Sequence, residues 1–102
     1  TGSGVPDVNG CGKGKEFWTE LKEIHSGNQL NLRPMQISWL AKRAMHGGQV
    51  FVLARKNGII KLFHVDSLTG IKELVKGGFK SKALLTLEVP YDWKALNTAL
   101  LS

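Results

Sequence analysis

The sequence predicts an α/β fold in one domain, with a mixed central β-sheet flanked by helices. Short apolar segments bounded by turn residues, typical of strands, alternate along the chain with segments whose apolar residues recur at helical spacing. No internal repeat, low-complexity stretch or linker interrupts this order, and 102 residues suffice for a single core. The expected order, β-β-α-β-β-α-β-α, belongs to one sheet with helices packed on it.

The first half of the chain is expected to form a hairpin and a helix. Val5 to Asn9 and Phe17 to Ile24 have the composition of strands, and the glycine-rich stretch Gly10 to Gly14 between them predicts a turn. After a polar loop, Pro34 suits the first turn of a helix that ends near His46, before two glycines. The apolar stripe of this helix comprises Ile37, Leu40, Ala41 and Ala44.

A second hairpin is expected in the middle of the chain. Gln49 to Arg55 and Ile59 to Val65 are apolar segments joined around Asn57-Gly58. Asn-Gly between two apolar segments is among the strongest hairpin signals, because both residues tolerate the positive φ of a tight turn.

The C-terminal part is expected to add a helix, a strand and a second helix. Asp66 or Ser67 suits the N-cap of a short helix that runs through Val75, although Gly70 weakens it. Lys82 to Val89 predicts the last strand, and 92–101 predicts a terminal helix. One side of that helix is apolar and carries Trp93, Leu96, Leu100 and Leu101.

The formal net charge of +6 is unevenly distributed. No acidic residue occurs from Ile24 to Val65, where several basic residues lie, and this pattern favours a polyanion partner. Four of the eight acids lie instead in the first quarter of the chain, as expected for a cation site beside a phosphate-binding surface. Charge alone leaves an ordinary solvated basic surface equally open. The basic residues of the tract are Arg33, Lys42, Arg43, Arg55, Lys56 and Lys61.

The expected location is intracellular: the cytoplasm, the nucleoid, or a host cell if the source is viral. Cys11 is the one cysteine, so no intramolecular disulfide can form, and no leader of the secretory kind opens the chain. No apolar run is long enough to cross a bilayer, so no membrane partner is expected.

Three polar residues are expected to converge on the first hairpin. Strand side chains alternate between faces, so Glu20 and Lys22 project from the same side of their strand. If the hairpin turns near Lys13-Gly14, Asp7 falls opposite Glu20. Two adjacent carboxylates repel each other, and a divalent oxygen-seeking cation such as Mg²⁺ relieves the repulsion. A lysine beside such an ion can assist hydrolysis of a phosphodiester.

The segment from Gly2 to Val8, followed by Glu20-Leu21-Lys22 and by Gln36 in the first helix, resembles the PD-(D/E)xK nuclease superfamily. Within it, the pattern is most similar to VRR-NUC domains and archaeal-type Holliday junction resolvases. The likeness extends to about Val65. It implies that residues 1–102 form a single nuclease-like domain with a restriction-endonuclease-like core.

The resemblance also implies a site. Asp7, Glu20 and the backbone carbonyl of Leu21 would bind Mg²⁺, with Mn²⁺ as a substitute, Lys22 would serve the attacking water, and Gln36 would support the site or the scissile strand. The family usually contributes a further glutamate from a helix before the first strand. That helix would lie upstream of Thr1, or another subunit would supply the acid, or the site would work without it.

The implied function is that of a metal-dependent DNA endonuclease, selective for branched DNA or Holliday junctions and acting as a homodimer. The alternative is a catalytically inactive nucleic-acid-binding module of the same fold. Glu20 and Lys22 alone would otherwise be interpreted as a charged pair on a solvated strand face. Trp39, Arg43 and His46 share one side of the first helix with Gln36; there, exposed helix surface and a core tryptophan are the simpler interpretation.

Overall fold

The computed structural model describes residues 6–12 and 14–101. Its centre is a five-stranded sheet in which the strands follow the chain order. Strands β2 and β3 pair in parallel, and every other neighbouring pair is antiparallel. Because a parallel pair needs a long crossover, a helix lies between these two strands. The strands are β1 (Val8–Gly12), β2 (Lys15–Glu23), β3 (Gln49–Lys56), β4 (Ile59–Val65) and β5 (Leu85–Leu87).

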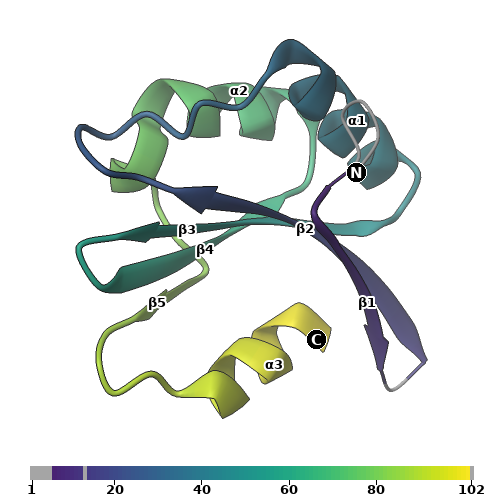
Figure 1. The fold of residues 1–102 in the computed structure, drawn as a ribbon. Coiled ribbons are helices and arrows are strands. Elements are labelled where there is room, and N and C mark those ends of the chain that lie inside the picture. Colours follow the sequence, from purple (N-terminus) through teal and green to yellow (C-terminus); the bar gives the residue numbers. More distant parts are fainter. Residues whose placement is uncertain (1–5, 13, 102) are drawn as a thin grey trace.

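Helices cover both faces of this sheet, so the predicted α/β class with a mixed, helix-flanked sheet is confirmed. Figure 1 shows α1 (Pro34–Met45) and α2 (Leu68–Gly77) on one face and α3 (Trp93–Leu101) on the other. A short 3₁₀ turn, η1 (Gly78–Lys80), follows α2. The crossover helix α1 therefore packs on the sheet next to the strand that carries Glu20.

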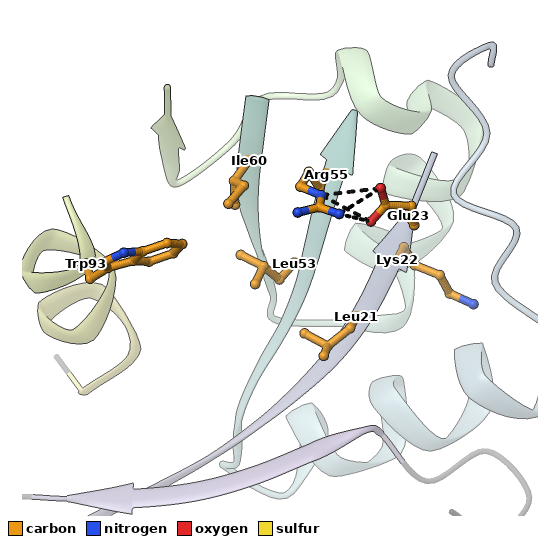
Figure 2. Close-up of a pocket in the computed structure, with 7 residues that line it drawn as sticks. All are labelled: Leu21, Lys22, Glu23, Leu53, Arg55, Ile60 and Trp93. Atoms are coloured by element: carbon orange, nitrogen blue, oxygen red, sulfur yellow. Dashed lines mark hydrogen bonds and ion pairs between the residues drawn. The ribbon is translucent and has the colours of Figure 1, made fainter. Parts of the chain in front are cut away.

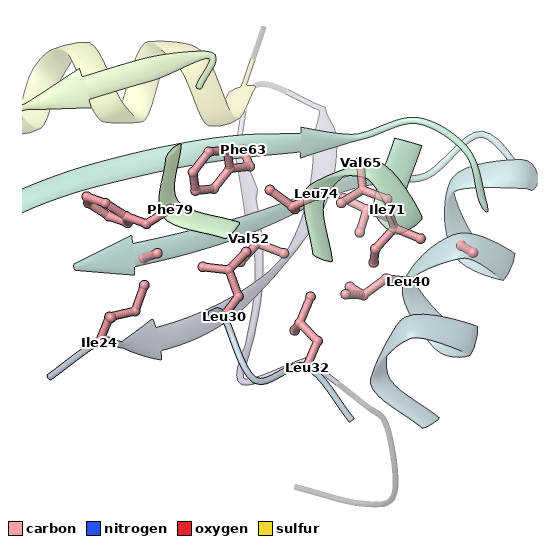
Figure 3. Close-up of a cluster of buried hydrophobic side chains, with 13 residues drawn as sticks. Ile24, Leu30, Leu32, Leu40, Val52, Phe63, Val65, Ile71, Leu74 and Phe79 are labelled. Atoms are coloured by element: carbon pink, nitrogen blue, oxygen red, sulfur yellow. The ribbon is translucent and has the colours of Figure 1, made fainter. Parts of the chain in front are cut away.

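The main core lies between the sheet and the helices α1 and α2 (Figure 3). Val50, Val52 and Ala54 of β3 are fully buried on this face. They are register partners of Trp18, Glu20 and Lys22 in β2. Because register partners share a face, Glu20 projects toward the face of the sheet that α1 and α2 cover. The buried cluster comprises Ile24, Leu30, Leu32, Leu40, Ala41, Val50, Val52, Ala54, Phe63, Val65, Ile71, Leu74 and Phe79.

The first strand differs from its prediction. It begins at Val8 rather than Val5, which lies outside the described residues, and it continues to Gly12 through the stretch predicted as a turn. The strand can pass through glycines because Gly10 pairs with Phe17, whose ring covers it. A Cβ at Gly10 would lie 2.4 Å from Cζ of Phe17, so the absent side chain makes room for the ring.

The loop between β2 and α1 was predicted to be polar, yet it supplies two core residues. Leu30 and Leu32 are 2% and 9% exposed and pack in the main cluster. The loop is also tied to η1, just after α2, since the amide of Phe79 donates to the carbonyl of Asn28 at 2.7 Å. This loop is therefore an ordered part of the core, and it holds the start of α1 in place.

The remaining elements follow the predictions closely, with one exception. The β3–β4 hairpin turns at Asn57 and Gly58, both with positive φ. Ser67 is the N-cap of α2, and its hydroxyl accepts from the amide of Gly70 at 2.9 Å. The last strand is shorter than the predicted Lys82 to Val89, because only 85–87 pair with β4.

The packing of Leu40 gives a test of the core. Leu40 is 0% exposed and faces the sheet from α1, so Leu40→Ala should lower the free energy of unfolding by about 2–5 kcal/mol. Met45→Ala on the same helix, where the side chain is 73% exposed, is the matched control and should change it little. Urea unfolding of both variants measures the difference, and equal midpoints would contradict this packing.

Candidate functional site

Two strands and one helix bring the predicted site residues together. The β1–β2 register pairs Val8 with Thr19. Continued by one residue, it sets Asp7 beside Glu20, as the simple hairpin register predicted. The Oδ2 atom of Asp7 accepts a hydrogen bond from the backbone amide of Leu21 at 3.0 Å. The Asp7 carboxylate is thereby held at the edge of β2, next to the strand position that carries Glu20.

Glu20 is a buried carboxylate, only 3% exposed. Its Oε2 atom accepts from Nε2 of Gln36 at 2.7 Å and lies 3.6 Å from Nζ of Lys22. Its Oε1 atom is buried and has no hydrogen-bond partner within residues 6–12 and 14–101. A buried carboxylate oxygen normally contacts a hydrogen-bond donor or a cation. Oε1 of Glu20 accepts no hydrogen bond from the described residues, so it can accept such a partner.

Gln36 links the elements of the site. It is the third residue of α1, and its Oε1 atom accepts from the backbone amide of Arg33 at 2.9 Å, which caps the start of the helix. The same oxygen accepts from Nζ of Lys22 at 3.3 Å, while Nε2 donates to Glu20. Gln36 therefore fixes the start of α1 and the positions of Glu20 and Lys22 with one side chain.

The Lys22 ammonium group has a fixed place. Besides Gln36, it donates to the backbone carbonyl of Asn31 at 3.3 Å, and its side chain is 18% exposed. This contact with the loop was not predictable, because nothing in the sequence indicates where the Asn31 carbonyl points. The Arg33 to Gln36 spacing, by contrast, places a glutamine at the third helical position, where its side chain can accept from the N-cap amide.

The electrostatics of Glu20 fit a cation site. Burial raises the pKa of the Glu20 carboxyl above its ordinary value of 4.5, and the negative charge of Asp7 raises the pKa further. The positive charge of Lys22 offsets part of this rise. A buried carboxylate whose pKa is raised by a second carboxylate nearby is a usual arrangement where a divalent ion binds, because the ion replaces the proton.

The backbone adds a third oxygen to these two carboxylates. In a strand, the N–H and C=O of one residue point to the same edge, so the Leu21 carbonyl emerges on the side where its amide meets Asp7. The described residues contain no group of three or more His, Cys, Asp or Glu side chains that could hold a metal ion. The donor set at this site is therefore two carboxylates and one carbonyl, which fits Mg²⁺ because that ion keeps several water ligands.

A hollow of about 350 Å³ lies on the opposite face of the sheet, between α3 and the strands (Figure 2). Leu21, Leu53, Ile60 and Trp93 form its apolar lining. Glu23 and Arg55 form an ion pair at its rim, with a shortest distance of 3.0 Å. This hollow has no carboxylate besides the paired Glu23, so it offers a surface for packing rather than a second metal site.

The basic tract predicted from residues 24–65 is divided in the fold. Lys61 donates to the carbonyl of Phe79 at 2.8 Å and lies over its ring, so this lysine is engaged within the protein. Arg55 is paired with Glu23 on β2. Lys42 and Arg43 lie in the last turn of α1 and are exposed. The tract thus forms no single continuous surface.

Comparison of the chain with protein-family models and with curated proteins finds no match. In the described part of the chain, no helix has the length and apolar character needed to cross a membrane. A functional assignment therefore rests on the geometry around Asp7, Glu20, Lys22 and Gln36.

The raised pKa of Glu20 predicts a pH-dependent cost to stability. Between its unfolded value and the raised folded value, the folded state binds the extra proton. The stabilising contribution of protonated Glu20 is therefore complete below about pH 4.5 and is lost as the pH rises through the folded pKa. Glu20→Gln, which keeps an acceptor for Gln36, should escape this loss.

The measurement is the free energy of urea unfolding of the parent and of Glu20→Gln, from pH 4 to pH 8 in buffer that contains a chelator. The stability difference in favour of the variant should grow with pH and then level off. Contributions of groups that do not interact with Glu20 cancel in the difference. A difference that does not change with pH would contradict the assigned environment of Glu20.

Proposed function

We propose that this protein is a metal-dependent DNA endonuclease with a restriction-endonuclease-like core, which hydrolyses phosphodiester bonds. The observation that carries the proposal is the unpartnered Oε1 of buried Glu20 beside Asp7, with Lys22 held next to it by Gln36. A structural ion pair would satisfy its own oxygens. This carboxylate instead keeps one oxygen available for a cation.

Asp7, Glu20 and the Leu21 carbonyl are the groups that would hold Mg²⁺ or Mn²⁺. When bound, the ion supplies Lewis-acid polarisation of the phosphodiester and lowers the pKa of bound water. Glu20 is buried beneath α1, whereas Asp7 is exposed beside β2. A phosphodiester would therefore reach the site from the side of Asp7.

Lys22 contributes a cation that the protein positions in advance. Its ammonium group is held by Oε1 of Gln36, the Asn31 carbonyl and Oε2 of Glu20, so its positive charge lies beside the carboxylate that would bind the ion. A positive charge held there stabilises the negative charge that develops on the phosphate in the transition state. Gln36 is a positioning residue in this scheme, since its amide touches Glu20 and Lys22 rather than the reacting atoms.

The arrangement of elements supports the restriction-endonuclease-like assignment. A hairpin carrying Asp7 and the Glu20-Leu21-Lys22 segment leads through helix α1 into a parallel strand and a second hairpin. The motif residues lie on the hairpin and on the first turn of α1, in the order that the resemblance to the PD-(D/E)xK superfamily implies. A branched-DNA substrate and a homodimer are the finer parts of the proposal, and they rest on the resemblance to resolvases.

Cleavage assays on linear, flapped and four-way DNA with Mg²⁺, Mn²⁺ or chelator test the reaction. Asp7→Asn, Glu20→Gln and Lys22→Met should each lower the cleavage rate by about a hundred-fold or more, because each removes a metal oxygen or a transition-state charge. Glu23→Gln is the matched control: it lies on the same strand, faces the other side of the sheet, and should cleave like the parent.

Wild-type rates for Asp7→Asn or Glu20→Gln would remove the metal assignment. A parent protein that binds DNA but cuts none of the substrates with either ion would instead identify the fold as a binding module.

Assembly follows from the number of sites per chain. One chain carries one set of Asp7, Glu20 and Lys22, so paired incisions across a junction need two subunits, and two-fold symmetry is the commonest way to supply them. Sedimentation velocity at micromolar concentration should show a dimer, alone or on four-way DNA. A protein that stays monomeric on the junction would exclude the symmetric model and leave a nicking enzyme.

A further inference from the structure

A groove with aromatic and basic side chains crosses the C-terminal end of α1. One hollow of about 330 Å³ lies between β2 and the end of the helix, and Lys15, Trp18, Arg43 and His46 contribute to its lining. A second hollow of about 220 Å³ shares Arg43 and His46 and adds Trp39 and Lys42. The two hollows share Arg43 and His46 and therefore lie next to each other, and together they are called the groove here.

The groove lies close to the Glu20 site along both β2 and α1. Trp18 lies two residues before Glu20 on the same face of β2, about 7 Å along the strand. Trp39 and Arg43 lie three and seven residues after Gln36, on the same side of α1, so Arg43 is about 10 Å from Gln36 along the helix axis. At about 3.4 Å per nucleotide in a stacked strand, this distance corresponds to about three nucleotides.

The side chains of the groove match unpaired nucleotides. Trp18 and Trp39 pack edge to face with ring centroids 4.9 Å apart, and the Arg43 guanidinium lies 5.8 Å from the Trp18 ring centroid. Tryptophan and arginine planes stack on bases that have left a duplex, and lysines beside them neutralise the phosphates. A duplex keeps its base faces stacked inside, so it would contact the lysines but would not stack on the tryptophans.

Two negative features act against an anion here. Glu16 accepts from Arg43 at 3.1 Å, and the last turn of α1 presents the negative end of the helix dipole, equivalent to roughly half a charge. Lys15, Lys42 and Arg43 outweigh both, so the groove stays positive. The Glu16 pair is exposed on both sides and is therefore weak. A phosphate can displace Glu16 from Arg43.

We propose that this groove, formed by Trp18, Trp39, Lys42, Arg43 and His46 with Lys15, binds a single-stranded DNA segment that extends from the Glu20 site. This inference rests on the proposed function for its substrate class and explains selectivity for branched DNA. An unpaired strand leaving a branch point would lie along α1, which would place the adjacent phosphodiester at Asp7 and Glu20.

Binding measured without metal tests the groove independently of cleavage. Fluorescence anisotropy in chelator would compare a single-stranded oligothymidine, a closed duplex hairpin, and the same duplex with an overhang of about six nucleotides. Trp39→Leu should weaken binding of the single strand and the overhang by roughly tenfold and change the hairpin little. Lys42→Ala should weaken binding and reduce the salt dependence by about one phosphate contact.

Matched controls lie on the other face of the sheet. Trp93→Leu and Lys94→Ala, both on α3 and exposed, should leave all three affinities unchanged. Trp39→Phe keeps an aromatic ring in the packing with Trp18 and should stay near the parent, so a folding defect in Trp39→Leu would be recognised. Glu16→Gln should tighten binding of the single strand, because it frees Arg43 for phosphate.

Unchanged single-strand affinity in Trp39→Leu and Lys42→Ala would overturn the proposal, as would equal losses for hairpin and single strand in Trp39→Leu. These results leave the endonuclease assignment intact if the parent still cleaves. If Trp39→Leu selectively loses single-strand binding while the parent cuts no substrate with Mg²⁺ or Mn²⁺, the groove is supported and the endonuclease proposal is refuted.

Discussion

A carboxylate buried between the sheet and α1 is the constraint on which the rest of the structure depends. Glu20 is 3% exposed and pairs in register with the fully buried Val52, at a position where an apolar residue would pack without cost. Removing a carboxylate from water costs several kcal/mol unless partners replace the water. The amide of Gln36 and the ammonium of Lys22 are those partners. The crossover helix must therefore begin where its third residue reaches Glu20.

The same contact connects helix capping to the site. Gln36 accepts from the Arg33 amide and from Lys22 while it donates to Glu20, so the start of α1 and the site geometry cannot vary independently. A helix shifted by one residue would turn this side chain by about 100° away from β2. The ordered loop before α1 prevents such a shift, because Leu30 and Leu32 are anchored in the core.

The proximity of Asp7, Glu20 and Lys22 could be predicted from the sequence because it follows simple periodic rules. Strand alternation puts Glu20 and Lys22 on one face, the hairpin register brings Asp7 beside them, and the two-glycine stop after α1 limits the crossover. The extension of β1 through Gly10 depends on the Phe17 ring, and the path of the loop between β2 and α1 depends on the burial of Leu30. Predictions from local composition are therefore wrong for both segments. The division of the basic tract has the same cause: whether a lysine such as Lys61 is engaged inside or exposed is decided by tertiary contacts.

The two carboxylate oxygens of Glu20 differ in their partners, and this difference favours a functional role for Glu20 over a stabilising one. A network that served the fold alone would satisfy both oxygens or would place a neutral side chain there, since a partly satisfied buried carboxylate is worse than an apolar one. Here Oε2 receives Gln36 and Lys22, whereas Oε1 receives nothing from the described residues and Asp7 adds a second negative charge nearby. The cost of this arrangement falls when a cation binds both carboxylates. Glu20 thus carries an electrostatic penalty that a divalent ion would relieve, at the position where the proposed nuclease would bind that ion.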